Sequence, residues 1–271
     1  MSVKLKIGIL GCGYVGKAVA QSLKPHHEVT AFTRRVNRLE ELATYANKVM
    51  VIEKTLDSLL ENQQILIITI APSQGDSYEE CYLKTAQAIA SCIAKCPNLR
   101  QIIYTSSTSV YGEYCGAWVD ENTIPNPQNE KEQVLLQAEK VLLSLTSKTP
   151  SVCILRLGEI FGPGRELTRR FAGNGRKIFP GTGENFTNLT HLADIINVIT
   201  FAINNALQGI YNLCLDIHPT RKLLYKQLCR RNHFPDPFWD TQAQTIHAGN
   251  KKVLCGKLRL AGYSLPFQGL A

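Results

Sequence analysis

The sequence predicts an α/β fold in which a doubly wound parallel sheet carries helices on both faces, followed by a small C-terminal lobe. Short segments that are apolar throughout alternate with amphipathic helical segments as far as residue 157, and such strands are typical of a parallel sheet buried on both faces. Near the start of the chain, an apolar run ends at closely spaced glycines and a helical pattern follows at once, IGILGCGYVGKAVAQSL. The 271 residues suffice for one such domain with a small lobe.

The expected elements follow one another in regular order. Strands are predicted at residues 4–10, 27–33, 48–52, 64–70, 100–106 and 151–157. Helices are predicted between them at 14–23, 38–46, 56–62, 78–96 and 130–145. After residue 158 the alternation becomes irregular, and we expect two or three more helices and one further strand at 209–215. We therefore assign a nucleotide-binding domain to 1–158, with contributions from about 185–215, and a small substrate-binding lobe to 159–184 and 216–271 at the carboxyl ends of the strands.

Composition and charge restrict the classes of protein that fit. Hydrophobic residues make up 44% and no apolar run reaches 18 residues, so we expect a globular, cytoplasmic protein with no membrane partner. The net charge is +8 without a recognisable nucleic-acid-binding module, so nucleic acid is not an expected partner. The basic zone 162–181 suits an anionic small-molecule substrate, and a solvated basic surface is the alternative. The nine cysteines have no CxxC spacing, so we expect reduced thiols and no metal site.

The glycine spacing after the first strand predicts a dinucleotide site. Gly11 permits the tight turn, Gly13 lets a pyrophosphate approach the backbone, and Gly16 lets the helix pack on the sheet. The amino end of the helix, at Tyr14 and Val15, offers N–H groups and a partial positive charge to phosphates. We assign these five residues to cofactor binding, and a tight turn without a ligand is the alternative.

The end of the second strand predicts which dinucleotide binds. A carboxylate there would hold a ribose 2′-hydroxyl and repel a 2′-phosphate. This chain has Thr33, Arg34 and Arg35 and no acid, and two guanidinium groups can hydrogen-bond a phosphate with charge assistance. The sequence therefore favours NADP(H) over NAD(H), unless the arginines merely end a strand on the surface.

Several later segments carry a family resemblance. In chain order they are YTSSTSVYGE, ILRLGEIFGPGRE, THLADIINVI, GIYNLCLDIHPTR and KKVLCGKLRLAGYSLPF. Together they resemble the extended short-chain dehydrogenase/reductase superfamily, and within it atypical members of the NAD(P)-dependent epimerase/dehydratase group that acts on nucleotide sugars. The resemblance covers nearly the whole chain and implies a Rossmann fold with a nicotinamide dinucleotide. Ala71 and Thr105 are two further cofactor-binding candidates.

The resemblance also implies a catalytic set of Asn, Ser, Tyr and Lys, which this chain matches only in part. The serine four residues before the tyrosine of VYG corresponds to Ser107, before Tyr111. The family's YxxxK positions fall on Lys131 and Leu135, so neither residue of that pair is present, and the asparagine position falls near Thr85.

This loss leaves the proton-transfer group open. A tyrosine exchanges a proton near neutral pH only if a neighbouring cation lowers its pKa. Tyr111 is the candidate substitute, a pocket-wall tyrosine is its alternative role, and Glu159 and Tyr114 are weaker candidates.

Two functions follow from these residues. The first is an NADP-dependent oxidoreductase, epimerase or dehydratase acting on a sugar nucleotide or another small carbonyl or hydroxyl compound. The second is a non-catalytic NADP(H)-binding redox sensor or regulatory protein. A homodimer is left open.

Overall fold

The computed structural model describes residues 4–52, 56–73, 75–147, 150–173, 176–243 and 249–264. The chain forms two compact units, each made of three segments. Unit 1 comprises residues 1–107, 133–156 and 195–211, and unit 2 comprises 108–132, 157–194 and 212–271. We describe each unit by itself.

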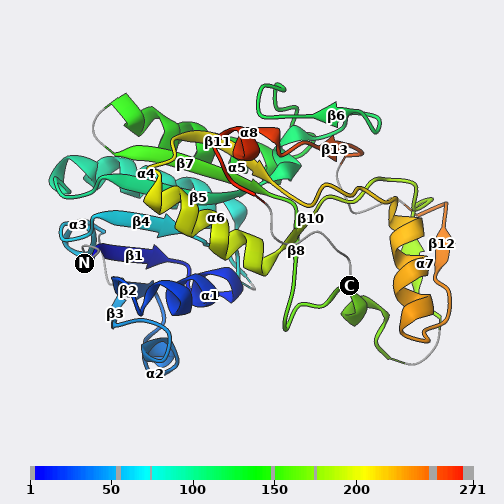
Figure 1. Cartoon of the computed structure of the whole chain (residues 1–271), viewed down its shortest axis with the longest axis horizontal. Coiled ribbons are helices and arrows are strands. Elements are labelled where there is room, and N and C mark those ends of the chain that lie inside the picture. The colour runs from blue at the N-terminus through cyan, green and yellow to red at the C-terminus, as the bar shows by residue number, and fades with distance from the viewer. Residues whose placement is uncertain are drawn as a thin grey trace. The chain divides into compact units, whose positions relative to one another are not determined.

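A seven-stranded sheet organises the first unit, with strand order β11-β7-β5-β4-β1-β2-β3 (Figure 1). Leu10 of β1 lies opposite Phe32 of β2 and Ile68 of β4, and Ile68 lies opposite Tyr104 of β5, all in parallel register. The chain winds outward from β1 in both directions, so the predicted doubly wound Rossmann-type sheet is confirmed. The strands are β1 Lys6–Leu10, β2 Glu28–Thr33, β3 Lys48–Val51, β4 Ile65–Ile68, β5 Gln101–Ser107, β7 Ser151–Leu157 and β11 Gly209–Leu213.

Helices cover both faces of this sheet. They are α1 Tyr14–Leu23, α2 Leu39–Ala43, α3 Asp57–Leu60, α4 Lys84–Cys92, α5 Glu130–Leu143 and α6 Leu192–Asn204. Leu66 and Ile68 of β4 belong to a buried cluster with residues of α4 and α5. Ile65 and Ile67 point to the opposite face, because side chains alternate along a strand, and they are buried as well.

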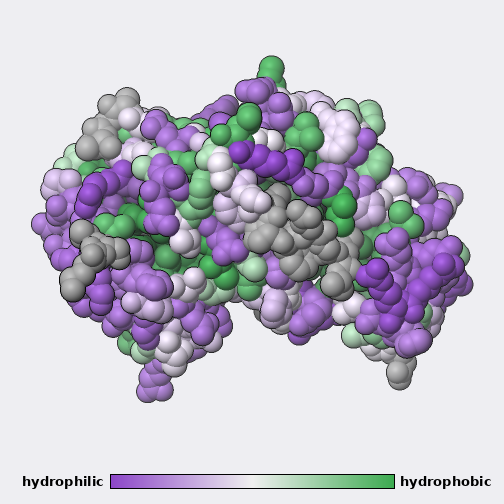
Figure 2. Space-filling model, in the orientation of Figure 1, coloured by the Kyte–Doolittle hydropathy of each residue, from purple (hydrophilic) through white to green (hydrophobic). Residues whose placement is uncertain are grey.

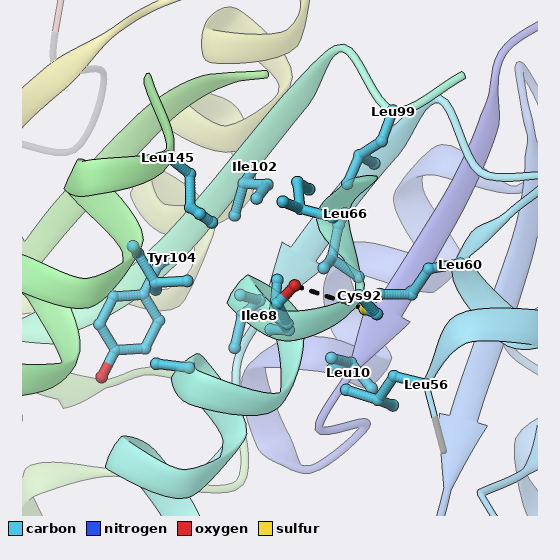
Figure 3. Close-up of a cluster of buried hydrophobic side chains, with 14 of the residues drawn as sticks. Leu10, Leu56, Leu60, Leu66, Ile68, Cys92, Leu99, Ile102, Tyr104 and Leu145 are labelled. Atoms are coloured by element: carbon cyan, nitrogen blue, oxygen red, sulfur yellow. Dashed lines mark hydrogen bonds between the residues drawn. The ribbon is translucent and has the colours of Figure 1, made fainter. Parts of the chain in front are cut away.

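The cluster against α4 and α5 forms one layer of the core. Figure 3 shows Leu10, Leu66, Ile68 and Ile102 from three neighbouring strands gathered around Cys92 of α4. Burial of each such aliphatic side chain contributes about 1.5–3 kcal/mol. Because side chains on both faces of β4 are buried, the strand is apolar along its whole length.

The predicted helix 78–96 is three consecutive helical segments in the structure. A π-helical turn, Glu79–Leu83, precedes α4, and a 3₁₀ turn, Ile93–Lys95, follows it. The apolar positions at Cys81, Ala86 and Ile89 are buried. The spacing of apolar residues therefore predicts a helical segment here, but it does not predict the changes of helix type within it.

Among its described residues, the second unit contains three short parallel strand pairs, β10-β8, β12-β9 and β13-β6. Its strands are β6 Trp118–Val119, β8 Glu159–Phe161, β9 Ile178–Pro180, β10 Leu189–His191, β12 Phe238–Asp240 and β13 Lys252–Val253. Its helices are α7 Arg221–Arg231 and α8 Gly256–Leu260. An aromatic-rich core, which includes Phe171 and Tyr225, packs around α7.

The segment 108–132 belongs to unit 2, although it lies within the range 1–158 predicted for the nucleotide-binding domain. The reason is its pairing with the end of the chain: β6 pairs with β13, as Figure 1 shows, and the backbone N–H of Tyr114 donates to the carbonyl of Asn250 at 3.2 Å. Residues 185–194 and 212–215 also belong to unit 2.

No helix in the part of the chain that the structure describes is long and apolar enough to cross a membrane.

Candidate cofactor site and catalytic residues

The glycine turn between β1 and α1 has the predicted geometry at two of its glycines. Gly11 has a φ of 90°, and a Cβ on it would lie 2.5 Å from the backbone nitrogen of Ile70. A Cβ on Gly16 would lie 2.4 Å from the carbonyl oxygen of Gly11. The hydroxyl of Thr69, which follows β4, donates to that same carbonyl at 2.9 Å. Gly11 and Gly16 are therefore required by the packing of the protein itself.

Gly13 differs from both. A Cβ built on Gly13 would have no described protein atom within 4 Å, and this residue is the N-cap of α1. Tyr14 and Val15 form the first helical positions, half-buried and buried respectively. Space beside a glycine N-cap, at a helix end with a partial positive charge, fits the pyrophosphate of a dinucleotide.

Three predicted residues gather where β2 ends. The Thr33 hydroxyl accepts a hydrogen bond from the backbone N–H of Arg35 at 3.1 Å, which fixes the chain as it leaves the strand. The side chain of Arg34 is 62% exposed, and its Nη2 lies 3.3 Å from a carboxylate oxygen of Asp76 in the loop after β4. Arg35 is exposed. Both guanidinium groups are accessible to a charged ligand, and Asp76 supplies the acid that contacts Arg34.

Arg38 also belongs to this corner, although the sequence did not predict it. Its Nη2 donates to the carbonyl oxygen of Cys12, inside the glycine turn, at 2.8 Å. Its Nε donates to Glu41 at 2.8 Å, and Lys17 of α1 donates to the same carboxylate at 3.0 Å. The arginine stands in the segment AFTRRVNR, but its contact with the turn depends on how η1, Val36–Arg38, bends back.

Two titratable groups beside the turn have shifted pKa values. Hydrogen bonds from Arg38, and then from Lys17, lower the pKa of Glu41 to about 2. Burial raises the pKa of the Cys12 thiol to about 12. At neutral pH Glu41 is therefore ionised, and Cys12 is a thiol without thiolate reactivity.

The remaining cofactor candidates lie beyond β4 and on β5. Ala71 is exposed in the segment that follows β4. The hydroxyl of Thr105 donates to the carbonyl oxygen of Ile68 at 3.2 Å, which ties the end of β5 to the end of β4. Both lie at the carboxyl ends of their strands, as the glycine turn does, and in a parallel sheet these ends lie along one edge.

Ser107, the last residue of β5, is half-buried. Its strand is anchored by the neighbouring Ser106, whose hydroxyl donates to Glu139 of α5 at 2.6 Å. Glu139 also forms a two-point ion pair with Arg156 of β7, with an Nη2–Oε2 distance of 2.6 Å and 1–2% exposure of both side chains. This buried link among β5, α5 and β7 fixes the strand end that carries Ser107.

The helix that bears the family's Tyr–Lys pair lacks that pair in this chain. At the corresponding positions of α5, Lys131 is exposed and Leu135 is buried. Thr85, at the predicted asparagine position, is half-buried on α4. The structure therefore places no tyrosine at the first YxxxK position of α5 and no lysine at the second.

Tyr111 lies in unit 2 and is fully buried. Its hydroxyl donates to Oδ1 of Asn212 at 2.9 Å, and Nδ2 of Asn212 donates to the carbonyl of Leu254 at 3.0 Å. Glu121 accepts from the backbone N–H of Asn212 at 2.8 Å. This satisfied buried network favours the structural role for Tyr111 over the proton-donor role.

The two weaker candidates are also engaged within unit 2. The Tyr114 hydroxyl donates to the carbonyl of Ile124, and the Glu159 carboxylate pairs with Arg170.

The fold and the glycine turn define a dinucleotide-binding protein, and comparison with known proteins gives its family. The NAD-dependent epimerase/dehydratase family model matches residues 7–214, so the chain belongs to that family. Protein YeeZ of Escherichia coli K12 is 32% identical over 262 residues, covering 93% of this chain and 91% of YeeZ.

Solved structures with the same fold have low sequence identity. A conserved protein of unknown function from Silicibacter pomeroyi has a TM-score of 0.80 at 22% identity, covering 98% of this chain and 95% of its own. MoeE5, solved with UDP-glucose and NAD, has a TM-score of 0.80 at 19% identity. The match covers 98% of this chain and 94% of the MoeE5 chain. A UDP-glucuronic acid 4-epimerase variant from Bacillus cereus, solved with a fluorinated UDP-glucuronic acid and NAD, has a TM-score of 0.81 at 17% identity, and the match covers 97% of this chain and 95% of the epimerase chain.

Proposed function

We propose that this protein is an NADP(H)-dependent enzyme of the epimerase/dehydratase family, an oxidoreductase, epimerase or dehydratase that acts on a sugar nucleotide or another small carbonyl or hydroxyl compound. The observation that carries the cofactor choice is the set of arginines after β2. Arg34 and Arg35 are exposed there, and Arg38 reaches the glycine turn itself. Nucleotide-sugar-binding neighbours of the same fold support the substrate class.

The residues divide the cofactor between them as follows. The amino end of α1 and Gly13 hold the pyrophosphate, and Arg34 and Arg35 hold the 2′-phosphate through charge-assisted hydrogen bonds. Asp76 exchanges its contact with Arg34 for solvent when the phosphate arrives, at small cost because the pair is exposed. A bound nicotinamide supplies the hydride donor or acceptor for carbonyl–hydroxyl chemistry.

Ser107 orients a substrate oxygen in this proposal. A serine hydroxyl can donate or accept a hydrogen bond, but it is a poor general acid or base at neutral pH. Proton transfer then needs another group or a water molecule, because α5 lacks the Tyr–Lys pair.

Titration of NADPH and NADH by fluorescence tests the cofactor assignment. We expect tighter binding of NADPH, and we expect Arg34→Ala combined with Arg35→Ala to weaken it roughly tenfold to a hundredfold while leaving NADH nearly unchanged. Arg100→Ala is the matched control, because Arg100 is exposed just before the amino end of β5. Equal affinities for the two cofactors in the parent protein would overturn the NADP assignment.

A second function, a non-catalytic NADP(H)-binding sensor, is favoured by two specific observations. The YxxxK positions hold Lys131 and Leu135, and the Tyr111 hydroxyl is committed to Asn212. A screen of nucleotide sugars and small carbonyl compounds, with NADPH oxidation as the readout, separates the sensor from the enzyme.

A further inference from the structure

Two arginines of unit 2, Arg170 and Arg221, both hydrogen-bond the same tyrosine, Tyr225. Arg170, in the 3₁₀ turn Leu167–Phe171, pairs with Glu159 of β8, and it also donates to the hydroxyl of Tyr225 on α7. The guanidinium carbon of Arg170 lies 5.1 Å from the centre of the Tyr225 ring. Arg221, the first residue of α7, also hydrogen-bonds Tyr225. We call these four residues the arginine cluster.

Arg221 is poorly satisfied by the protein. Its Nε is buried without a hydrogen-bond partner among the residues that the structure describes. Burial lowers the pKa of Arg221, Tyr225 and Glu159 oppose part of this shift, and the charge of Arg170 adds to it. Burying a guanidinium next to a like charge, with one donor unpaired, costs free energy.

The cluster carries one positive charge more than its single carboxylate balances. The Tyr225 ring packs edge-on against Phe171 at 5.2 Å and stacks with Trp239 at 5.6 Å, which fixes the phenol between the two guanidinium groups. Arg221 is half-buried as a residue, and its Nε is buried. Fixed, partly dehydrated guanidinium groups are suited to a phosphate, which accepts several charge-assisted hydrogen bonds at once.

The backbone at the start of α7 is not the origin of this site. Its first N–H groups already have partners: Arg221 N–H donates to the Asn185 carbonyl at 2.9 Å and Lys222 N–H to the Gly183 carbonyl at 2.8 Å. The N-cap Thr220 accepts from Leu223 at 3.3 Å. The excess charge therefore resides in the side chains.

We propose that Arg170 and Arg221 bind a single phosphoryl group, so that the small molecule recognised by unit 2 is a phosphate monoester, which selects a phosphorylated carbonyl or hydroxyl compound over a sugar nucleotide among the proposed substrates. Glu159 sets the limit to one group, because it neutralises part of the positive charge and would repel the second phosphate of a diphosphate. That the bound phosphoryl group belongs to a substrate rests on the proposed function, whereas the existence of the site does not.

Calorimetric titration of the full-length protein with inorganic phosphate tests the site without any turnover. We expect phosphate to bind the parent protein and Arg221→Gln to weaken it roughly tenfold or more. Arg221→Lys keeps the charge but loses the fork, and we expect an intermediate affinity. Arg230→Gln is the matched control, because it removes an exposed arginine from the last turn of the same helix, and we expect an affinity within twofold of the parent.

Several outcomes would overturn the proposal. One is that phosphate fails to bind the parent protein, and another is that Arg221→Gln and Arg230→Gln bind it equally well. If UDP binds more tightly than phosphate and depends on Arg221 to the same degree, the site takes a diphosphate and the single-group assignment is wrong. NADPH affinity, measured on each variant, reports correct folding, and its absence from the parent protein would contradict the proposed function but not the phosphate site.

Discussion

At position 13 a Cβ would meet open space, whereas at position 11 it would lie 2.5 Å from a backbone nitrogen. Gly13→Val should therefore fold normally and lose NADPH binding, since the valine side chain would occupy the space assigned to the pyrophosphate. Gly11→Ala is the contrasting variant, because its φ of 90° and the close contact both disfavour a side chain. We expect it to lower the free energy of unfolding by about 2–4 kcal/mol. Normal NADPH affinity in folded Gly13→Val would remove the glycine turn from the cofactor site.

Around this turn, the residues that the sequence predicts act locally. Those that it does not predict contact residues far away in the sequence. Gly11, Gly13 and Gly16 are predictable because the tight turn and the helix start are local events encoded by spacing. The contact of Arg38 with Cys12 spans 26 residues. Such a contact depends on the path of the chain after β2. The spacing of residues in the sequence does not predict that path. Asp76 was missed for the same reason, since its contact with Arg34 spans 42 residues.

At the scale of elements, the predicted strands match those of the structure because a strand buried on both faces of a sheet needs apolar residues along its whole length. The predicted strand 151–157 coincides with β7, and the predicted helix 14–23 coincides with α1. The short strand pairs of unit 2 were not predicted, because pairs such as β6–β13 contain only two residues per strand and join distant segments. No two-residue segment has a period that identifies a strand.

The buried pair between α5 and β7 makes a prediction about stability. Glu139→Gln would leave Arg156 buried beside a neutral amide, and we expect it to lower the free energy of unfolding by about 3–5 kcal/mol. Glu130→Gln, at an exposed position of the same helix, should cost less than about 1 kcal/mol. Urea unfolding of both variants compares the costs, and a loss from Glu139→Gln no larger than that of the control would show that the ion pair does not anchor β5.

The contacts that join α1, α2 and η1 through Glu41 predict a dependence on pH. The pKa of Glu41 is lowered from 4.5 to about 2 in the folded protein, so the ionised form stabilises the fold fully above about pH 5 and loses this contribution as the pH falls towards 2. The side chain is 41% exposed, so the contribution is about 1 kcal/mol or less. Glu41→Gln should therefore be slightly less stable than the parent at pH 7, and the difference should shrink between pH 4.5 and 2. A difference that is constant over this range would contradict the assignment.

For the whole molecule, family membership indicates an enzyme, whereas the absence of the Tyr–Lys pair does not support the usual catalytic mechanism. The chain belongs to a family named for epimerase and dehydratase chemistry, yet the YxxxK positions on α5 hold Lys131 and Leu135. The fold and the glycine turn could be predicted because they recur together in this kind of sheet. The reaction could not, because a fold does not determine the chemistry performed on it.

Tyr111→Phe, measured together with a substrate screen, decides between the roles of this residue and between the two functions of the protein. If Tyr111 is structural, the variant leaves Oδ1 of buried Asn212 without its donor and should lower the free energy of unfolding by about 1–3 kcal/mol. Its turnover and NADPH affinity should then equal those of the parent, and this is the result we expect from the satisfied network around Asn212. A proton donor would instead lose about 10²–10⁴ in turnover at unchanged NADPH affinity. If the parent binds NADPH tightly and a broad screen yields no oxidation, the sensor replaces the enzyme as the function of the whole chain.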